Sequence, residues 1–405
     1  MKSACLFACV AVALCAISLW AGPARSDGPA SAPPTGASRD ARTALGRTIF
    51  FDSTLSEPAG TSCASCHEAA RAFSGDHGSG VGVAAGSRPG VFARRSTPSL
   101  LYLAFIPRFR FFSDDDDRHN ADAEPYGGFF WDGRSDSIAD LVQQPLLNPR
   151  EMNNRDLDQI AEKVRRAPYA SALAAEFPGA LDDTKKAVAA LGVALEAYLT
   201  SPPMAPFSSR YDDYIRGAGT LTAEEARGLA LFKDPKRGGC AVCHKLVDTS
   251  PSPEQSMFTD FGFDAVGAPR NTKLRVHDED RGLCERTDNV NPSNATQWCV
   301  SFRTPSLRNV ALRKSFMHNG AFTRLRDVIS FYATRATNPA RWYPSATPFD
   351  DTPPAYRGLI NTTFVPYDRH PGAPPAFDES EIDALVAFLG TLTDRKLPDA
   401  GRSNP

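Results

Sequence analysis

Apolar and polar residues alternate with helical spacing in two segments that resemble each other. The segments 46–52 (GRTIFFD) and 228–234 (GLALFKD) share the pattern Gly-x-x-(Ile/Leu)-Phe-x-Asp, one in each half of the chain. Each predicts an amphipathic helix that buries its Ile/Leu-Phe face. Because a repeated pattern indicates repeated structure, the sequence predicts two related helical units.

Further amphipathic segments mark where these units begin and end. Thr222 and Glu225 have the spacing of a capping box, which predicts a helix start. Residues 184–200 predict a helix that closes the first unit. The last predicted helix opens at Ser380-Glu-Ile-Asp383, and its apolar residues share one face: Ile382, Leu385, Val386 and Leu389.

The length and composition are those of a globular protein with two domains. A chain of 405 residues is too long for one ordinary hydrophobic core. No stretch is rich in strand patterns, so we expect mainly all-α domains at 41–210 and 211–400. The net charge of −2 gives no sign of a nucleic-acid partner.

The N-terminus has the pattern of an export signal. Met1-Lys2 precede an apolar run at 4–20, which a segment rich in small residues and proline follows. This pattern predicts a cleaved signal peptide over 1–24 and a disordered leader over 25–40. An uncleaved anchor is the alternative, although the run is shorter than the ~20 residues that a spanning helix needs. We therefore expect a periplasmic protein without stable membrane insertion.

Two C-x-x-C-H motifs carry the chemistry of the chain. Each predicts a covalently bound haem c, because two thiols at this spacing reach the two vinyl groups and the adjacent histidine reaches the iron. A thioredoxin-like pair would not need the histidine, and a zinc site would need a second Cys or His pair nearby. The predicted haem-binding residues are Cys63, Cys66 and His67 in the first half and Cys240, Cys243 and His244 in the second.

One cysteine pair remains outside the signal peptide and the two motifs. Cys284 and Cys299 are even in number and, in an exported protein, meet an oxidising compartment. This predicts a disulfide, with two buried free thiols as the alternative.

Four further segments occur in the order of a known family: FFWDGRSDSI (129–138), LLNPREM (146–152), FRTPSLRNVALRKSFMHNG (302–320) and LRDVISFY (325–332). With the paired haem motifs, they resemble the bacterial dihaem cytochrome c peroxidase family over residues 40–395. The resemblance implies two cytochrome c-like domains that face each other, with one c-type haem in each.

The resemblance also places a second ligand on the haem of the C-terminal half. The family's ligand lies fourteen residues after the histidine of an H-x-G motif, and from His318 this position is Tyr332. Ordinary peroxidases of the family have Met there, whereas the MauG branch has Tyr. A phenol oxygen stabilises oxidised iron, whereas Met raises the potential. The alternative is an ordinary aromatic residue on a helix that starts near Leu325.

The first haem lacks the removable histidine of ordinary family members. That histidine lies sixteen residues after the motif histidine, and here the position is Val83. His77 lies at a different offset in a Gly-rich loop, where a solvated side chain is the expected state and ligation the alternative. The resemblance therefore implies an open haem face to which hydrogen peroxide binds.

Two residues are predicted to serve this open face. The family's acid-base glutamate lies twenty residues after the Trp of WDGR, which gives Glu151. It would take the peroxide proton and deliver it to the leaving oxygen. Pro145 matches a distal proline that forms a small apolar wall. The family's distal Gln is replaced by Leu141, with Gln143 and Gln144 nearby, so the sequence does not determine which residues form the distal hydrogen bonds. The alternative for Glu151 is a surface carboxylate at a helix start.

Trp131 matches the tryptophan that lies between the two haems in the family. Its indole would let both haems share the oxidising equivalents of one peroxide. The alternative is a buried packing residue.

A calcium ion between the domains is the least secure expectation. The family's Asn ligand is replaced by Ser96, and the carbonyl-donor stretch reads LRKSF at 312–316, with an added Arg313 charge. Asp114–Asp117 and the histidines 119, 277 and 370 lie in polar stretches and predict exposed loops.

The resemblance therefore implies a MauG-like enzyme that uses hydrogen peroxide to form high-valent haem iron and oxidises Trp or Tyr residues of a partner protein by long-range electron transfer. Two other functions stay open. One is a peroxidase that takes electrons from a small cytochrome c or cupredoxin, and the other is a non-catalytic dihaem electron carrier.

Overall fold

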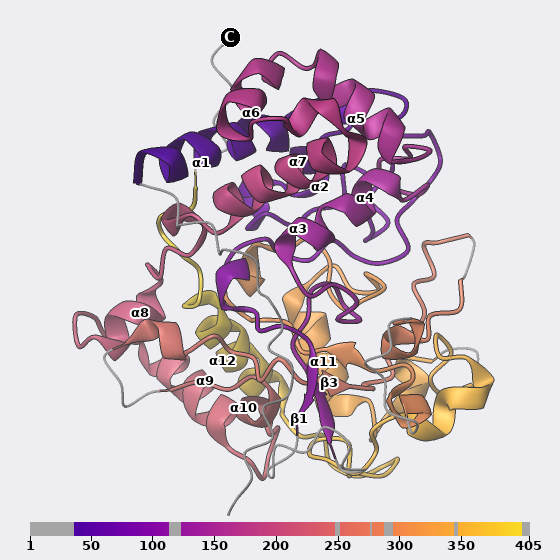
Figure 1. Cartoon of the computed structure of the whole chain (residues 1–405). Helices are drawn as coiled ribbons and strands as arrows, with labels where there is room; N and C mark the ends of the chain where they lie inside the picture. The colour runs from indigo at the N-terminus through magenta and orange to yellow at the C-terminus, as the bar shows by residue number, and fades with distance from the viewer. Residues whose placement is uncertain are drawn as a thin grey trace, which may run out of the picture.

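The chain folds into two helical halves, which lie one above the other in Figure 1. The computed structural model describes residues 36–112, 123–247, 252–275, 278–286, 295–343 and 347–398. The predicted signal peptide, the Asp114–Asp117 run, His119 and His277 lie outside the described residues. Within those ranges, no helix is long and apolar enough to cross a membrane.

The first half contains seven of the α-helices. They are α1 (Gly36–Phe50), α2 (Cys63–Cys66), α3 (Ile138–Leu141), α4 (Gln143–Leu147), α5 (Leu157–Arg166), α6 (Ala170–Glu176) and α7 (Thr184–Leu199). Because α1 begins at Gly36, residues 36–40 are helical. The expectation of a disordered leader up to residue 40 is therefore wrong for its last five residues.

The second half is built around five α-helices and longer irregular segments. The helices are α8 (Arg210–Ile215), α9 (Ala223–Lys233), α10 (Cys240–Cys243), α11 (Leu325–Thr334) and α12 (Glu379–Gly390). The predicted capping box of Thr222 and Glu225 starts α9. For α12 the box consists of Asp378 and Glu381, so the predicted start at Ser380 lies inside the first turn.

In the part of the chain that the structure describes, strands are few and short, as the sequence predicted. Strands β1 (Arg110–Phe112) and β2 (Glu124–Tyr126) pair antiparallel, and so do β3 (Phe263–Asp264) and β4 (Phe302–Arg303). The β1–β2 hairpin belongs to the first half, but Phe109 and Phe111 pack with Phe263 and Leu283 of the second half. The hairpin thus joins the two halves.

The Gly-x-x-(Ile/Leu)-Phe-x-Asp pattern that occurs in both halves corresponds to the same close contact between two helices in each half. A Cβ atom added at Gly46 of α1 would lie 1.9 Å from the carbonyl oxygen of Ala194 on α7. At Gly228 of α9 it would lie 2.0 Å from the carbonyl oxygen of Ala384 on α12. Glycine therefore lets two backbones touch in each half, and one large hydrophobic core forms around each crossing.

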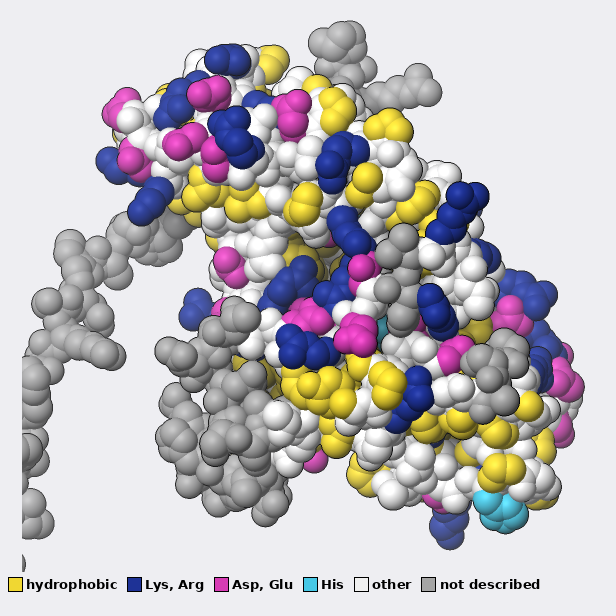
Figure 2. Space-filling model, turned by 90° about the vertical axis from the view of Figure 1, so that its right-hand side faces the viewer, with side chains coloured by type: hydrophobic (Ala, Val, Ile, Leu, Met, Phe, Trp, Pro, Cys, Tyr) yellow, Lys and Arg dark blue, Asp and Glu magenta, His cyan; other side chains and the backbone are white. Residues whose placement is uncertain are grey.

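Charged side chains form a network between the halves. Arg95 donates to Asp132 at 2.6 Å and to Asp280 of the second half at 2.7 Å, and Arg94 donates to Glu285 at 2.7 Å. Burial would raise the pKa of Asp280, but Arg95 beside it lowers that pKa far below its usual range. Figure 2 shows side chains of both charges gathered at the waist between the halves.

We expect Gly228→Ala to lower the free energy of unfolding by about 1–3 kcal/mol, because the new methyl group overlaps the Ala384 carbonyl. Gly390→Ala is the matched control, since a Cβ there meets no atom within 4 Å. Urea denaturation followed by circular dichroism measures both. Equal stability of the two variants would contradict the crossing.

Candidate functional site

Each C-x-x-C-H motif forms one helical turn that ends in a histidine with a fixed ring. Nδ1 of His67 lies 2.8 Å from the carbonyl oxygen of Phe73, and Nδ1 of His244 lies 3.0 Å from that of Phe258. A carbonyl partner makes Nδ1 the protonated nitrogen and leaves Nε2 with a free lone pair for a metal. Burial lowers the pKa of His67 to about 4 and lowers that of His244, so both rings are neutral.

A second repeat, which the sequence analysis missed, supports these carbonyls. Thr-Pro-Ser-Leu occurs at 97–100 and again at 304–307. The hydroxyl of Ser99 donates to the Ala72 carbonyl at 2.6 Å, and that of Ser306 donates to the Met257 carbonyl at 2.6 Å. Each serine thus holds the residue that precedes the histidine's partner. The repetition of these four residues was the sequence signal that could have revealed this support.

The residues around the first motif fit a flat apolar group. A cavity of about 270 Å³ adjoins His67, and its lining is mostly apolar: Phe50, Phe51, Ala64, His67, Glu68, Ala69, Ala70 and Phe73. Phe50 and Phe51 come from the repeated segment 46–52, and Phe50 belongs to the face that was predicted to be buried. The four motif cysteines are free of disulfides, and burial raises the pKa of each thiol to about 12. The donor set therefore suits thioether attachment of a haem.

The loop on the far side of this motif is held by the second half. Val83 is fully buried, and Asn271 donates one amide to the Val81 carbonyl at 2.8 Å. Gly82 and Gly320 pack backbone to backbone, since a Cβ on Gly82 would lie 2.2 Å from the Gly320 oxygen. Nδ1 of His77 lies 2.8 Å from the Ala85 carbonyl, so this ring is tied to its own loop.

Glu151 lies near the first motif in a water-poor setting. Burial raises its pKa, whereas Arg134 and a hydrogen bond from Asn148 lower it. Nδ2 of Asn148 is 2.7 Å from the Glu151 carboxylate. The charge of Glu151 contributes to the raised pKa of the Cys66 thiol, which places the carboxylate beside the motif. Burial thus moves the proton exchange of this carboxyl to higher pH than that of an exposed Glu.

Arg134 organises the polar groups around Glu151. It donates to the Gln144 side chain at 2.7 Å and to Asp132 at 2.9 Å. Gln144 thus provides an amide near the position where Leu141 stands, and Leu141 itself belongs to the first core. Pro145 lies on α4, where its carbonyl accepts the amide of Met152 at 3.1 Å.

Trp131 lies between the two halves. Its indole donates to the Ser96 carbonyl at 2.8 Å, and its own carbonyl accepts the amide of Arg303 at 2.7 Å. Ser96 in turn donates its amide to the His318 carbonyl at 2.7 Å. Trp131 therefore contacts both halves through hydrogen bonds.

Tyr332 lies on α11 beside the second motif. Burial raises its pKa, and the neighbouring Asp264, Cys243 and Cys240 raise it further. Tyr367 stacks on the ring with 6.0 Å between centroids, and a hydrogen bond from Tyr367 lowers the pKa of Tyr332. The sequence analysis missed Tyr367, because no local pattern announces it.

Several other predicted residues have clear roles. Cys284 and Cys299 form the predicted disulfide. His318 is buried, stacks on Phe302 at 3.6 Å and pairs with Asp351 at 3.2 Å. His370 is exposed, as expected.

Known proteins resemble this chain in sequence. The family model described as di-haem cytochrome c peroxidase matches residues 40–220. The methylamine utilization protein MauG of Paracoccus denitrificans is 35% identical, over 88% of this chain and 89% of its own. The cytochrome c551 peroxidase of Pseudomonas aeruginosa is 26% identical, over 71% of this chain and 70% of its own.

Solved structures agree with these relatives. The dihaem peroxidase BthA from Burkholderia thailandensis is 46% identical with a TM-score of 0.83, covering 91% of this chain and 89% of its own. A MauG-like protein associated with microbial copper homeostasis is 26% identical with a TM-score of 0.61, covering 92% and 96%.

The fold and these likenesses define a haem peroxidase-type oxidoreductase with two cytochrome c-like domains. The relative at 35% identity spans most of both chains. The chain belongs to the dihaem cytochrome c peroxidase family that includes the MauG proteins.

We expect the carboxyl of Glu151 to stay protonated at pH values where an exposed Glu, with a pKa of about 4.3, is ionised. Infrared difference spectra of wild type against Glu151→Gln follow its C=O stretch through a pH titration. Arg134→Gln removes a charge that lowers this pKa, so the protonated band should persist to higher pH. Arg150→Gln is the control, because Arg150 pairs with Asp278 instead. Loss of the protonated C=O band at the pH where an exposed Glu ionises would contradict the burial of the Glu151 carboxyl.

Proposed function

We propose that the protein binds two haem c groups, at Cys63, Cys66 and His67 and at Cys240, Cys243 and His244, and uses hydrogen peroxide to oxidise Trp or Tyr residues of a partner protein. The observation that carries this proposal is the position of Tyr332, whose phenol lies beside the second motif. An oxygen ligand there stabilises oxidised iron and favours the storage of oxidising equivalents. The likeness to MauG over most of the chain supports the same function.

Glu151 handles the protons of the reaction. One hydrogen peroxide takes up two electrons and two protons and yields two water molecules, and the electrons come from the partner. When bound, the haem iron supplies the oxidation–reduction chemistry. The Glu151 carboxylate accepts the proton from the oxygen nearest the haem and returns it to the leaving oxygen, while Asn148 holds the carboxylate in place. Pro145 offers no ligand atom on the same side.

Trp131 is proposed to link the two haem sites. It is buried, its indole donates to the Ser96 carbonyl, and its backbone carbonyl accepts the amide of Arg303 in the second half. An aromatic ring held this way shortens the distance that an electron crosses between the sites. Electrons from a partner at the second site thus reach the first.

An ordinary peroxidase is the second candidate. The cytochrome c551 peroxidase of Pseudomonas aeruginosa is a relative, and a small redox protein would then be the electron donor. Fast turnover with a reduced small cytochrome or cupredoxin would support this candidate. Slow turnover with such donors is expected if the partner is a protein substrate.

We place the enzyme in the periplasm. The disulfide supports an oxidising compartment, which haem c attachment also suits. The calcium ion stays a prediction. Ser96, which replaces the Asn ligand of the family, donates its hydroxyl to the Met317 carbonyl at 2.7 Å, and Arg313 donates to the Thr97 carbonyl at 3.2 Å.

We expect Glu151→Gln to slow the reaction with stoichiometric peroxide by about 10²–10⁴-fold, the usual contribution of a general acid-base group. Stopped-flow absorbance of the haem bands measures the rate. Glu57→Gln is the control, since Glu57 pairs with Lys163 on the surface. A similar rate in both variants would rule out the role of Glu151.

We expect electron paramagnetic resonance of the ferric protein to show a high-spin haem beside a low-spin one, and Tyr332→Phe to change the low-spin signal alone. Tyr367→Phe should keep the ligand and shift that signal, because only a hydrogen bond is removed. Tyr214→Phe, at an exposed position on α8, should change neither the high-spin nor the low-spin signal. An unchanged spectrum in Tyr332→Phe would refute ligation, and two low-spin haems inert to peroxide would refute the enzyme.

A further inference from the structure

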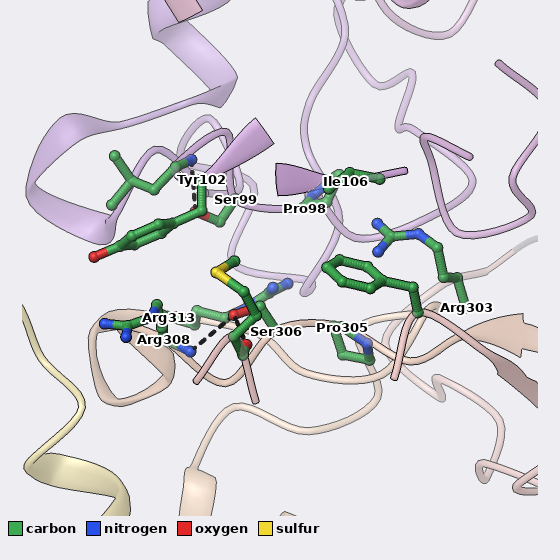
Figure 3. A pocket seen from close by; sticks show the side chains of 12 residues that line it. Pro98, Ser99, Tyr102, Ile106, Arg303, Pro305, Ser306, Arg308 and Arg313 are labelled. Carbon is green, nitrogen blue, oxygen red and sulfur yellow. Dashed lines mark hydrogen bonds between the residues drawn. The ribbon is translucent and has the colours of Figure 1, made fainter. Parts of the chain in front are cut away.

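A cavity lies between the two halves. Pro98 and Ser99 line it from the first half, and Pro305 and Ser306 line it from the second (Figure 3). The backbone of Pro98 also hydrogen-bonds to His67, and that of Pro305 hydrogen-bonds to His244. The cavity therefore adjoins both proposed haem sites.

Three arginines of the second half line this cavity, and only one of them has a carboxylate partner among the described residues. Arg308 donates to Asp212 at 2.9 and 3.2 Å. Arg303 and Arg313 form no ion pair with any described residue. Figure 3 shows the side chains of Arg303 and Arg313 among those that line the cavity.

Within the described ranges, both guanidinium groups donate their hydrogen bonds to backbone carbonyl oxygens. Nε of Arg303 lies 3.3 Å from the carbonyl oxygen of Phe130. Arg313 donates to the carbonyls of Ser315 at 3.3 Å and Thr97 at 3.2 Å. Burial lowers the pKa of both groups to about 10, and Asp132 offsets this in part for Arg303 alone.

A buried charge without a counter-charge costs several kcal/mol in a protein interior. Carbonyl dipoles offset only part of this cost, whereas a carboxylate accepts two parallel hydrogen bonds from a guanidinium. Arg303 is buried with the Asp132 charge nearby, and Arg313 is half-buried without a carboxylate partner among the described residues. The cavity therefore has an excess of positive charge, which suits an anion. Haem c, attached through its vinyl edge, carries two propionate carboxylates on the opposite edge.

We propose that Arg303 and Arg313 bind haem propionates at the interface and supply the positive charge that balances them. The proposal rests on the proposed function, because it requires haems at both motifs. Arg313 lies 6.0 Å from the Trp131 ring, so the same cation borders the proposed electron path. The ligand that the two arginines would bind is a carboxylate or another small anion. It would come either from the haem or from a dissolved salt.

The test uses the full-length protein with its haems, in the variants Arg313→Met and Arg303→Met. Met removes the charge but keeps an apolar chain of similar reach, so folding is retained. The pyridine haemochrome assay gives the haem content, and spectroelectrochemistry gives the midpoint potentials. Arg326→Gln is the control, because Arg326 pairs with Glu379 and Asp383 on the surface.

Each Met variant should lower the midpoint potential of at least one haem and shift the propionate bending band in resonance Raman spectra, while Arg326→Gln does neither. Arg313→Lys, which keeps the charge without the fork, should restore most of the potential. Wild-type potentials and bands in both Met variants would overturn the proposal. So would a wild-type potential that changes with phosphate or chloride concentration, which assigns the site to a solute anion. A wild-type protein without haem would instead refute the proposed function.

Discussion

The orientation of one histidine ring in each half is the constraint on which the rest of the site depends. An imidazole can turn either nitrogen toward a metal, so Nδ1 must be occupied by a fixed acceptor. The carbonyls of Phe73 and Phe258 do this from a left-handed backbone, with φ of 53° and 52°. The serines of the repeated Thr-Pro-Ser-Leu loops hold the neighbouring carbonyls. The helix crossings at the two repeated glycines then set the apolar wall against which the ring and its ligand group pack.

Features that depend on residues close together in the sequence could be predicted from the sequence. A capping box is complete within four residues, so the start of α9 at Thr222 was correct. The start of α12 was placed too late, because Ser380 also has the character of a cap residue while Asp378 makes the bonds. The disulfide followed from cysteine counting and the compartment. Helix α1 extends into a stretch whose composition alone resembles a leader.

What the sequence did not disclose depends on contacts between distant segments. The family's distal Gln is replaced by Leu141, so the sequence could not show which residue takes part in the distal hydrogen bonds. Only the fold shows that the Gln144 side chain accepts a hydrogen bond from Arg134. Tyr367 meets Tyr332 from a separate segment. The cavity with unpaired Arg303 joins residues from both halves, and no spacing rule connects them. Counting residues from the family's motifs identified single positions such as Tyr332. The residues that contact those positions could be identified only from the structure.

The contact between Gly82 and Gly320 has a consequence for how such an enzyme is controlled. Both backbones are left-handed, with φ of 88° and 70°, and neither residue has room for a side chain. The loop that precedes Val83 is thus anchored to the opposite half of the molecule. A retractable ligand needs a loop that swings, and here swinging would mean parting the two halves. Under the proposed function, this loop would therefore not gate the access of peroxide to the first haem site, and control would act through the supply of peroxide or of the partner.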